Sequence, residues 1–98
     1  MSILGVDVSR EVVGYYQHAA GTINTAATVK TGGGSVVLIQ AEAQNVRIRL
    51  DGVDPTASVG HLLVANSSMT VNIGDNKALA IRAIAATAGA ILNVTSFR

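Results

Sequence analysis

Apolar and polar residues alternate in several short stretches of this chain, which is the spacing of β-strands with one buried face. The clearest stretch is residues 46–51 (VRIRLD), where every second residue is apolar and the others are charged. Residues 69–73 (MTVNI) alternate in the same way. Asp51-Gly52 favours a turn after the first stretch, because glycine adopts a positive φ without steric cost. The pattern predicts a β-rich protein.

Residues 35–42 (SVVLIQAE) and 45–51 are predicted to pair as neighbouring strands of a β-hairpin, with Ala43-Gln44 near the bend. Residues 22–31, rich in β-branched side chains, favour another strand, and residues 61–65 a short one. The three glycines at 32–34 predict a hairpin tip. A phosphate-binding loop would need a Lys-Ser/Thr pair and a following helix, whereas strand-like residues follow here.

Residues 78–88 (ALAIRAIAATA) are open to two interpretations. Their alanine content is typical of a helix. Against that, residues 79–83 alternate as a strand does, and the segment has no clear helix cap. Residues 90–97 (AILNVTSF) are typical of a β-branched strand. We therefore predict a second hairpin, with its turn near Ala88-Gly89.

The predicted strands recur at intervals of about 8–12 residues with turns between them, which is typical of an all-β sandwich or barrel. A chain of 98 residues has room for one domain. We expect residues 1–98 to form a single β domain, a small β-sandwich or jelly-roll-like barrel. Near the N-terminus, residues 12–17 (VVGYYQ) are a candidate strand interrupted by Gly14, and residues 1–11 a candidate extended arm.

The composition favours association with other protein surfaces. Hydrophobic residues make up 49% of the chain and charged residues 13%, about half the usual charged share of roughly 25%. Two tyrosines and one phenylalanine are the only aromatic residues, so the core must be built from small side chains. A domain of this size gains limited burial by itself. We expect the chain to bury more surface in a homo-oligomer, with a trimer as the first expectation, or on a larger assembly.

The net charge of +1 argues against nucleic acid as a partner, because that partner requires a clustered basic face. Arg47 and Arg49 are the one close basic pair, and they fit a solvated strand face. The absence of cysteine excludes disulfides, thiolate metal sites and thiol nucleophiles. The chain shows neither a signal-peptide pattern nor a stretch near the ~20 apolar residues of a membrane span. We expect synthesis in a cytoplasm and no membrane partner.

Residues that could carry chemistry are sparse and form no motif. His18 and His61 lack a partner at a metal-ligand spacing, and the turn residues Asp51, Asp54 and Asp75 do not match an EF-hand loop. No Gly-x-Ser-x-Gly element supports a nucleophilic serine. We expect no enzymatic activity and no bound metal or cofactor.

Two blocks of the sequence, QAEAQNVRIRLDGVDPTASVGHLLVANSSMTVNI and AIRAIAATAGAILNVTSF, resemble a family of small bacteriophage virion proteins. The shared elements are a strand ending AEAQNVR-R-DG, a DPTASVG loop, an LL-A run and a final hairpin ending A-LNVT plus an aromatic residue. They fall within residues 37–97, roughly the last two-thirds of the chain. Members of the family look like structural proteins of the phage particle, encoded among its head and tail genes.

The resemblance implies a virion protein. The first hypothesis is a capsid decoration or cement protein that binds the major capsid protein and stabilises the head. The alternative is a head–tail connector, tail or fibre-base structural protein. A small carbohydrate- or host-binding β module is a third hypothesis, and the scarcity of aromatic side chains counts against it.

Contacts with a lattice are expected from loops and from the N-terminal arm, because these segments can reach neighbours while the sandwich holds them. The arm offers apolar anchors and one basic residue: Ile3, Leu4, Val6, Val8 and Arg10. The loop 52–60 offers a proline-stiffened shape that loses little entropy on docking. Its predicted contact residues are Asp54, Pro55 and Thr56.

Overall fold

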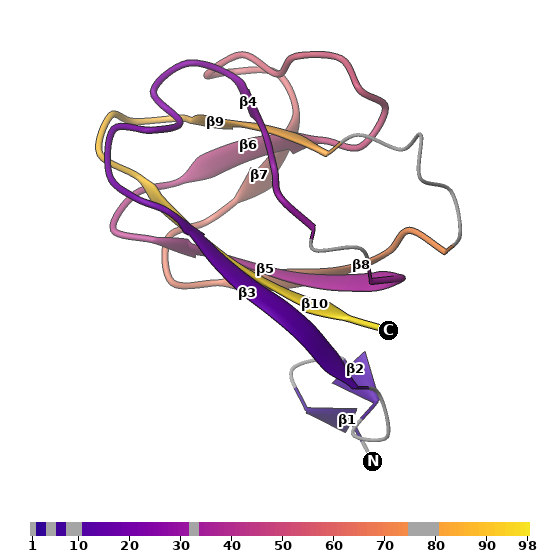
Figure 1. Ribbon diagram of the computed structural model, residues 1–98. Helices are drawn as coiled ribbons and strands as arrows, with labels where there is room; N and C mark the ends of the chain where they lie inside the picture. The colour runs from indigo at the N-terminus through magenta and orange to yellow at the C-terminus, as the bar shows by residue number, and fades with distance from the viewer. Residues whose placement is uncertain (1, 4–5, 8–10, 32–33, 75–80) are drawn as a thin grey trace.

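The chain folds into β-strands joined by turns and loops, as seen in a computed structural model that describes residues 2–3, 6–7, 11–31, 34–74 and 81–98 (Figure 1). No helix occurs among these described residues. In chain order the strands are β1 (Ser2–Ile3), β2 (Val6–Asp7), β3 (Val12–His18), β4 (Ala27–Thr28), β5 (Val36–Glu42), β6 (Val46–Arg49), β7 (His61–Leu63), β8 (Ser68–Asn72), β9 (Arg82–Ala85) and β10 (Ile91–Phe97). The expected all-β class is confirmed.

Strands β3 to β10 form two four-stranded antiparallel sheets that pack as a sandwich (Figure 1). One sheet, here the β10 sheet, has the order β3-β10-β5-β8, and the other, the β9 sheet, has the order β4-β9-β6-β7. The chain pairs like one long hairpin folded over on itself: β3 with β10, β4 with β9, β5 with β8 and β6 with β7. This strand order is that of a jelly roll.

The core lies between the two sheets and is built from every second residue of the facing strands. Val46 and Ile48 on β6 are fully buried, while Arg47 and Arg49, which alternate with them, are only partly buried, as the alternation predicts. The other buried hydrophobic residues of the strands are Val36, Val37, Ile39, Ala41, Leu63, Val71, Ala83, Ala85, Leu92 and Val94. Most of them are small or β-branched, so each contributes a modest buried area.

The predicted hairpin of residues 35–42 and 45–51 is wrong. β5 lies in the β10 sheet and β6 in the β9 sheet, so the chain crosses between the sheets at residues 43–45. Ala43 has a φ of 73°, and Oδ1 of Asn45 accepts a hydrogen bond from the backbone N–H of Ala65 at 2.8 Å, which stabilises the crossing. Alternation shows which face of a strand is buried, but it does not show in which of the two sheets the strand lies or with which strand it pairs.

The second predicted hairpin is also wrong, although its strands are present. Ile81, Ala83 and Ala85 are buried, and β9 begins directly after Ile81, at Arg82; residues 78–80 lie outside the described part of the chain. β9 and β10 belong to opposite sheets, so the chain crosses between them near Gly89, whose φ is 94°. The described part of the alanine-rich segment is thus a strand that buries Ala83 and Ala85 in the core.

The segments before β5 also cross between sheets. β3 continues through Gly14 at the edge of the β10 sheet, and residues 22–31 contribute a strand of two residues, β4. β4 and β5 lie in opposite sheets, so the predicted hairpin pairing of these two segments is wrong; Gly32 and Gly33 of its predicted tip lie outside the described residues. Gly34 is buried, and a Cβ on it would lie 2.2 Å from the carbonyl oxygen of Phe97.

Candidate partner-binding surfaces

The N-terminal segment forms a small ribbon outside the sandwich (Figure 1). β1 pairs antiparallel with β2, with Ile3 opposite Val6, in a sheet separate from the two sheets of the jelly roll. We call β1 and β2 the N-terminal ribbon. The other predicted anchors of the arm lie outside the described residues: Leu4, Val8 and Arg10. The expected extended arm is therefore folded back on itself in a two-stranded pairing.

The chain leaves the ribbon beside the end of β10. Both carboxylate oxygens of Glu11 accept hydrogen bonds of 3.1 Å from the guanidinium of Arg98. The backbone N–H of Arg98 also donates to the carbonyl of Glu11 at 2.9 Å. The hydrogen bond from Arg98 lowers the pKa of the Glu11 carboxyl. Such an exposed ion pair adds little stability, but together these bonds hold Glu11 beside the end of β10.

The loop 52–60, between β6 and β7, is tied to the outer face of the β9 sheet. Arg47 on β6 donates from Nη1 to the carbonyl of Gly60 at 3.1 Å and from Nε to the carbonyl of Ala57 at 3.4 Å. A Cβ at Gly60, whose φ is 134°, would lie 3.2 Å from Cβ of Pro55. Arg47, which the sequence places on a solvated face, therefore holds the loop in place.

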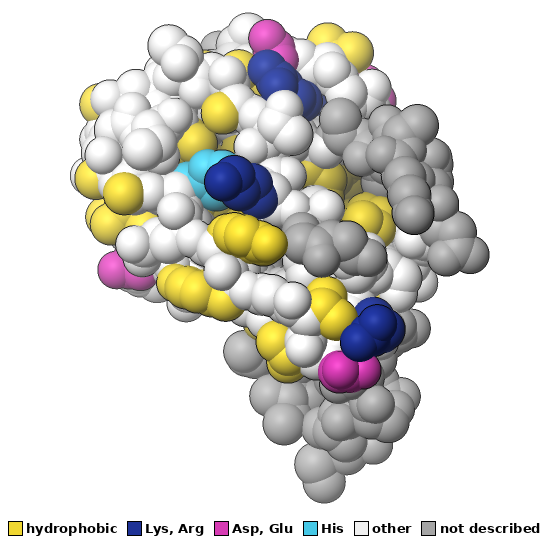
Figure 2. Space-filling view, viewed as in Figure 1, with side chains coloured by type: hydrophobic (Ala, Val, Ile, Leu, Met, Phe, Trp, Pro, Cys, Tyr) yellow, Lys and Arg dark blue, Asp and Glu magenta, His cyan; other side chains and the backbone are white. Residues whose placement is uncertain are grey.

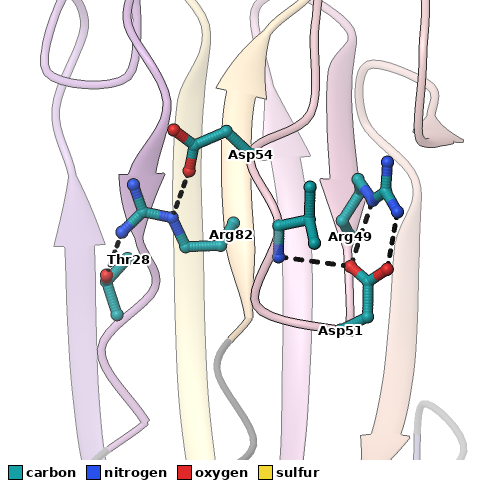
Figure 3. A network of polar contacts seen from close by, with 6 residues as sticks. Thr28, Arg49, Asp51, Asp54 and Arg82 are labelled. Carbon is teal, nitrogen blue, oxygen red and sulfur yellow. Dashed lines mark hydrogen bonds and ion pairs between the residues drawn. The ribbon is translucent and has the colours of Figure 1, made fainter.

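The three predicted contact residues of this loop differ in what they offer a partner. Oδ1 of Asp54 accepts a hydrogen bond from Nε of Arg82 at 2.7 Å (Figure 3). Pro55 is buried. Thr56 is exposed, and its backbone exchanges two hydrogen bonds with Val59, at 3.0 and 3.3 Å. Of the three, Asp54 and Thr56 are thus accessible to a partner and Pro55 is not. We call residues 56–59 the tip of the loop.

The arginines on the outer face of the β9 sheet all have partners within the chain. Arg82 donates to Thr28 as well as to Asp54 and so links β9, β4 and the loop (Figure 3). Arg49 donates to both carboxylate oxygens of Asp51, at 2.5 and 3.0 Å, and this hydrogen bonding lowers the pKa of Asp51 to about 2. Guanidinium groups already paired with carboxylates are poorly placed to bind phosphate.

Exposed apolar side chains follow one edge of the β9 sheet. Leu62 on the edge strand β7, Val64 after it and Val59 before it are each about half exposed. Figure 2 shows another part of the surface, with β3 and β4 nearest the viewer, and there too charged side chains are few and hydrophobic ones lie among them. An edge strand also presents unpaired backbone groups. These features favour contact with another protein surface.

His18 lies at the end of β3 beside Lys30. The backbone N–H of Lys30 donates to Nε2 of His18 at 3.5 Å, and Nζ of Lys30 lies 5.9 Å from the centre of the Tyr16 ring. Burial, aided by the charge of Lys30, lowers the pKa of His18. The neutral imidazole therefore packs against the segment that follows β4.

A cluster of polar side chains crosses the outer face of the β10 sheet, with Asn93 of β10 at its centre. Oδ1 of Asn93 accepts hydrogen bonds from the hydroxyl of Tyr15 at 2.6 Å and from Nε2 of Gln17 at 3.0 Å. Its Nδ2 donates to Oε1 of Glu42 at 2.9 Å and, at 3.4 Å, to Oε1 of Gln40. We call these five residues the Asn93 cluster. No sequence motif marks it, because its members come from three strands.

The described residues contain no group of three or more His, Cys, Asp or Glu side chains placed to hold a metal ion. Asp51 and Asp54 are bound to different arginines, and Asp75 lies outside the described residues. No helix in the described ranges is long and apolar enough to span a membrane.

No protein-family model, curated protein or solved structure matches this chain. Its class is therefore defined by its own fold, a small jelly roll with a projecting N-terminal ribbon. The surfaces available for function are the ribbon, the β7 edge with the tip of the loop 52–60, and the Asn93 cluster.

Proposed function

We propose that this chain is a structural protein of a bacteriophage particle, a capsid decoration or cement protein that binds the major capsid protein and stabilises the head. The observation that carries the proposal is the N-terminal ribbon, which lies outside the jelly roll and pairs with itself (Figure 1). A two-stranded hairpin is at best marginally stable in water. Residues 2–8 (SILGVDV) are mainly apolar, so such a ribbon gains stability when a partner covers it.

The sandwich supports the same proposal. Jelly rolls recur in viral capsid proteins, although they also occur in proteins of other functions, so this support is by analogy. The resemblance to phage virion proteins covers residues 37–97, which include the β6–β7 pair and the loop between them. A rigid sandwich that presents a ribbon at one place and a pinned loop at another suits a protein that joins neighbouring subunits.

Self-association belongs to the same proposal, with a trimer as its first form. The exposed apolar residues at the β7 edge, Val59, Leu62 and Val64, are the described surface best suited to a second copy of the chain. Purified protein should then scatter light as a multiple of 10.0 kDa. A head–tail connector or fibre base would present the same features, and the number of copies per particle separates these roles: hundreds for a decoration protein, a handful for a connector.

The test is removal of residues 2–10 from the purified protein, followed by its addition to particles that lack it. Because the ribbon forms a separate sheet, we expect the shortened chain to keep the circular dichroism spectrum of the jelly roll. We expect its retention on sedimented particles to fall at least about tenfold, a loss of ~1.4 kcal/mol or more in binding. The double variant Ile3→Asp, Val6→Asp should be retained similarly poorly. Ser68→Asp serves as the control, because it adds an acidic residue at an exposed position of β8, away from the ribbon and the β7 edge.

Full retention of the shortened chain would exclude the ribbon as the anchor. The tip of the loop 52–60 would then be the better candidate for the contact. Absence of the intact chain from purified particles of the phage that encodes it would overturn the proposal as a whole.

A further inference from the structure

The Asn93 cluster is an ordered polar surface on the outer face of a sheet. Its residues come from three neighbouring strands: Tyr15 and Gln17 from β3, Asn93 from β10, Gln40 and Glu42 from β5. The register places Asn93 directly opposite both Gln17 and Gln40. Tyr15 and Glu42 occupy diagonal positions, which still allow cross-strand contact.

Asn93 makes four hydrogen bonds, so its amide has no capacity left. Its oxygen accepts two, from Tyr15 and Gln17, and its nitrogen donates two, to Gln40 and Glu42. These bonds hold the four outer side chains in fixed directions. Fixed side chains lose less conformational entropy when a ligand binds them.

Each of the four side chains around Asn93 uses one polar atom for its hydrogen bond with Asn93, and its other polar atoms remain available to a ligand. Tyr15, Gln17, Gln40 and Glu42 are all exposed. Gln40 accepts with its oxygen and keeps an NH₂ group, Glu42 keeps a second carboxylate oxygen, and Gln17 keeps its amide oxygen. A ligand thus meets donors and acceptors side by side, which suits hydroxyl groups because each hydroxyl both donates and accepts.

An exposed aromatic ring borders this polar surface. Tyr15 is 58% exposed although its hydroxyl is fixed at 2.6 Å from Asn93. Its ring is therefore held in place while much of its surface remains open to solvent. A sugar ring has one face of C–H groups and a rim of hydroxyls, so it can contact an aromatic ring and hydrogen-bonding side chains together.

The charge of the face restricts the class of sugar. Among the outward positions of the described strands next to Asn93, Glu42 supplies the one charged group; the others carry Tyr15, Gln17, Leu38, Gln40, Ile91 and Thr95. A lone carboxylate disfavours sialylated, sulphated or phosphorylated glycans, because like charges repel.

We propose that the Asn93 cluster binds a neutral oligosaccharide. The ring of Tyr15 contacts the C–H face of one sugar residue, and Gln40 and Glu42 hydrogen-bond its hydroxyls. This inference goes beyond the proposed role in the particle and does not depend on it. A peptide is a poorer occupant, because peptides that bind sheets pair with an edge strand, whereas the cluster lies across the face of three paired strands.

The test is binding of the full chain to an array of immobilised glycans that contains neutral, sialylated and sulphated members. Each neutral glycan that binds is then titrated in solution by isothermal calorimetry. We expect Tyr15→Ala and Gln40→Ala each to weaken binding about tenfold, and Tyr15→Phe to weaken it less because the ring remains. The matched control is Leu62→Ala, which removes an exposed apolar side chain from the other sheet.

The intact fold of each variant is verified by its thermal unfolding curve, and the exposure of Tyr15 and Gln40 makes retention of the fold the expected result. Binding that is about tenfold weaker in both Tyr15→Ala and Gln40→Ala, with full binding by Leu62→Ala, supports the site. The proposal is overturned if no neutral glycan binds, if only anionic glycans bind, or if Tyr15→Ala binds as well as the unaltered chain. Removal of residues 2–10 should leave glycan binding unchanged, which separates this inference from the role of the ribbon.

Discussion

Replacing Gly34 by alanine places a methyl group against the backbone of β10. Its Cβ would lie 2.2 Å from the carbonyl oxygen of Phe97 and 2.7 Å from the carbonyl carbon. Real Cβ atoms essentially never come closer than 3.0 Å to another heavy atom, so the two segments must separate by about 0.8 Å. Both contacted atoms belong to the backbone, so rotation of a side chain cannot relieve the clash.

The same movement breaks a hydrogen bond. The backbone N–H of Ser35 donates to that oxygen of Phe97 at 2.8 Å, and about 0.8 Å more takes the distance beyond the range of a hydrogen bond. A lost backbone hydrogen bond costs about 1 kcal/mol and overpacking about 1–3 kcal/mol. Alanine also restricts the unfolded chain, which offsets about 0.4–1 kcal/mol. We expect Gly34→Ala to lower the free energy of unfolding by about 2–3 kcal/mol.

The assay is urea denaturation followed by circular dichroism, at one protein concentration because association changes apparent stability. In thermal unfolding, the same loss lowers the midpoint by roughly 10–20 °C for a domain of this size. The matched control is Gly14→Ala, where the new Cβ would lie 3.3 Å from a side-chain atom of Tyr16 that can move. We expect the control to stay within about 0.5 kcal/mol of the unaltered chain. Equal stability of the two variants would refute the close approach of Gly34 to β10.

Three further predictions concern the core, an ion pair and the pinned loop. Leu92→Ala should lower the free energy of unfolding by about 2–5 kcal/mol in urea denaturation, because Leu92 is fully buried. Leu62 is about half exposed, so Leu62→Ala should lower it by less than about 1 kcal/mol. Similar losses in the two variants would contradict the assigned core. Asp51→Asn should lower the unfolding temperature slightly at pH 7. The difference from the unaltered chain should vanish as the pH falls from about 4 to about 2, because a carboxyl with a lowered pKa loses its contribution to stability over that interval. A difference in unfolding temperature that stays constant with pH in calorimetry would contradict this pH dependence. Arg47→Ala should speed amide hydrogen exchange in the loop that its guanidinium holds while β10 remains protected, and unchanged exchange would show that other contacts hold the loop.

The burial of the strands could be predicted from the sequence, but their pairing could not. The inward positions Val46, Ile48 and Val71 follow from a period of two, which is a local property. The partner of a strand depends on residues far away in the chain. In a jelly roll most consecutive strands lie in opposite sheets, so the prior expectation that neighbours in sequence form hairpins failed at residues 43–45 and near Gly89.

The candidate surfaces, like the strand pairing, could be predicted from the sequence only in part. The sequence indicated a stiff loop around Pro55, but it carried no sign that Pro55 is buried or that Arg47 holds the loop carbonyls. The Asn93 cluster joins residues as far apart in the chain as Tyr15 and Asn93, so no local spacing reveals it. The available signal was a polar residue at an outward position of each of three predicted strands. Only the strand order β3-β10-β5 shows that these polar positions lie side by side.

Cryo-electron microscopy of the phage particle that we propose to contain this chain tests the central proposal most directly. The proposal predicts density for the jelly roll at symmetry-related positions over the head, with the N-terminal ribbon seated on the major capsid protein. Density confined to the tail or to the head–tail junction, or no density for this chain on the particle, would contradict it.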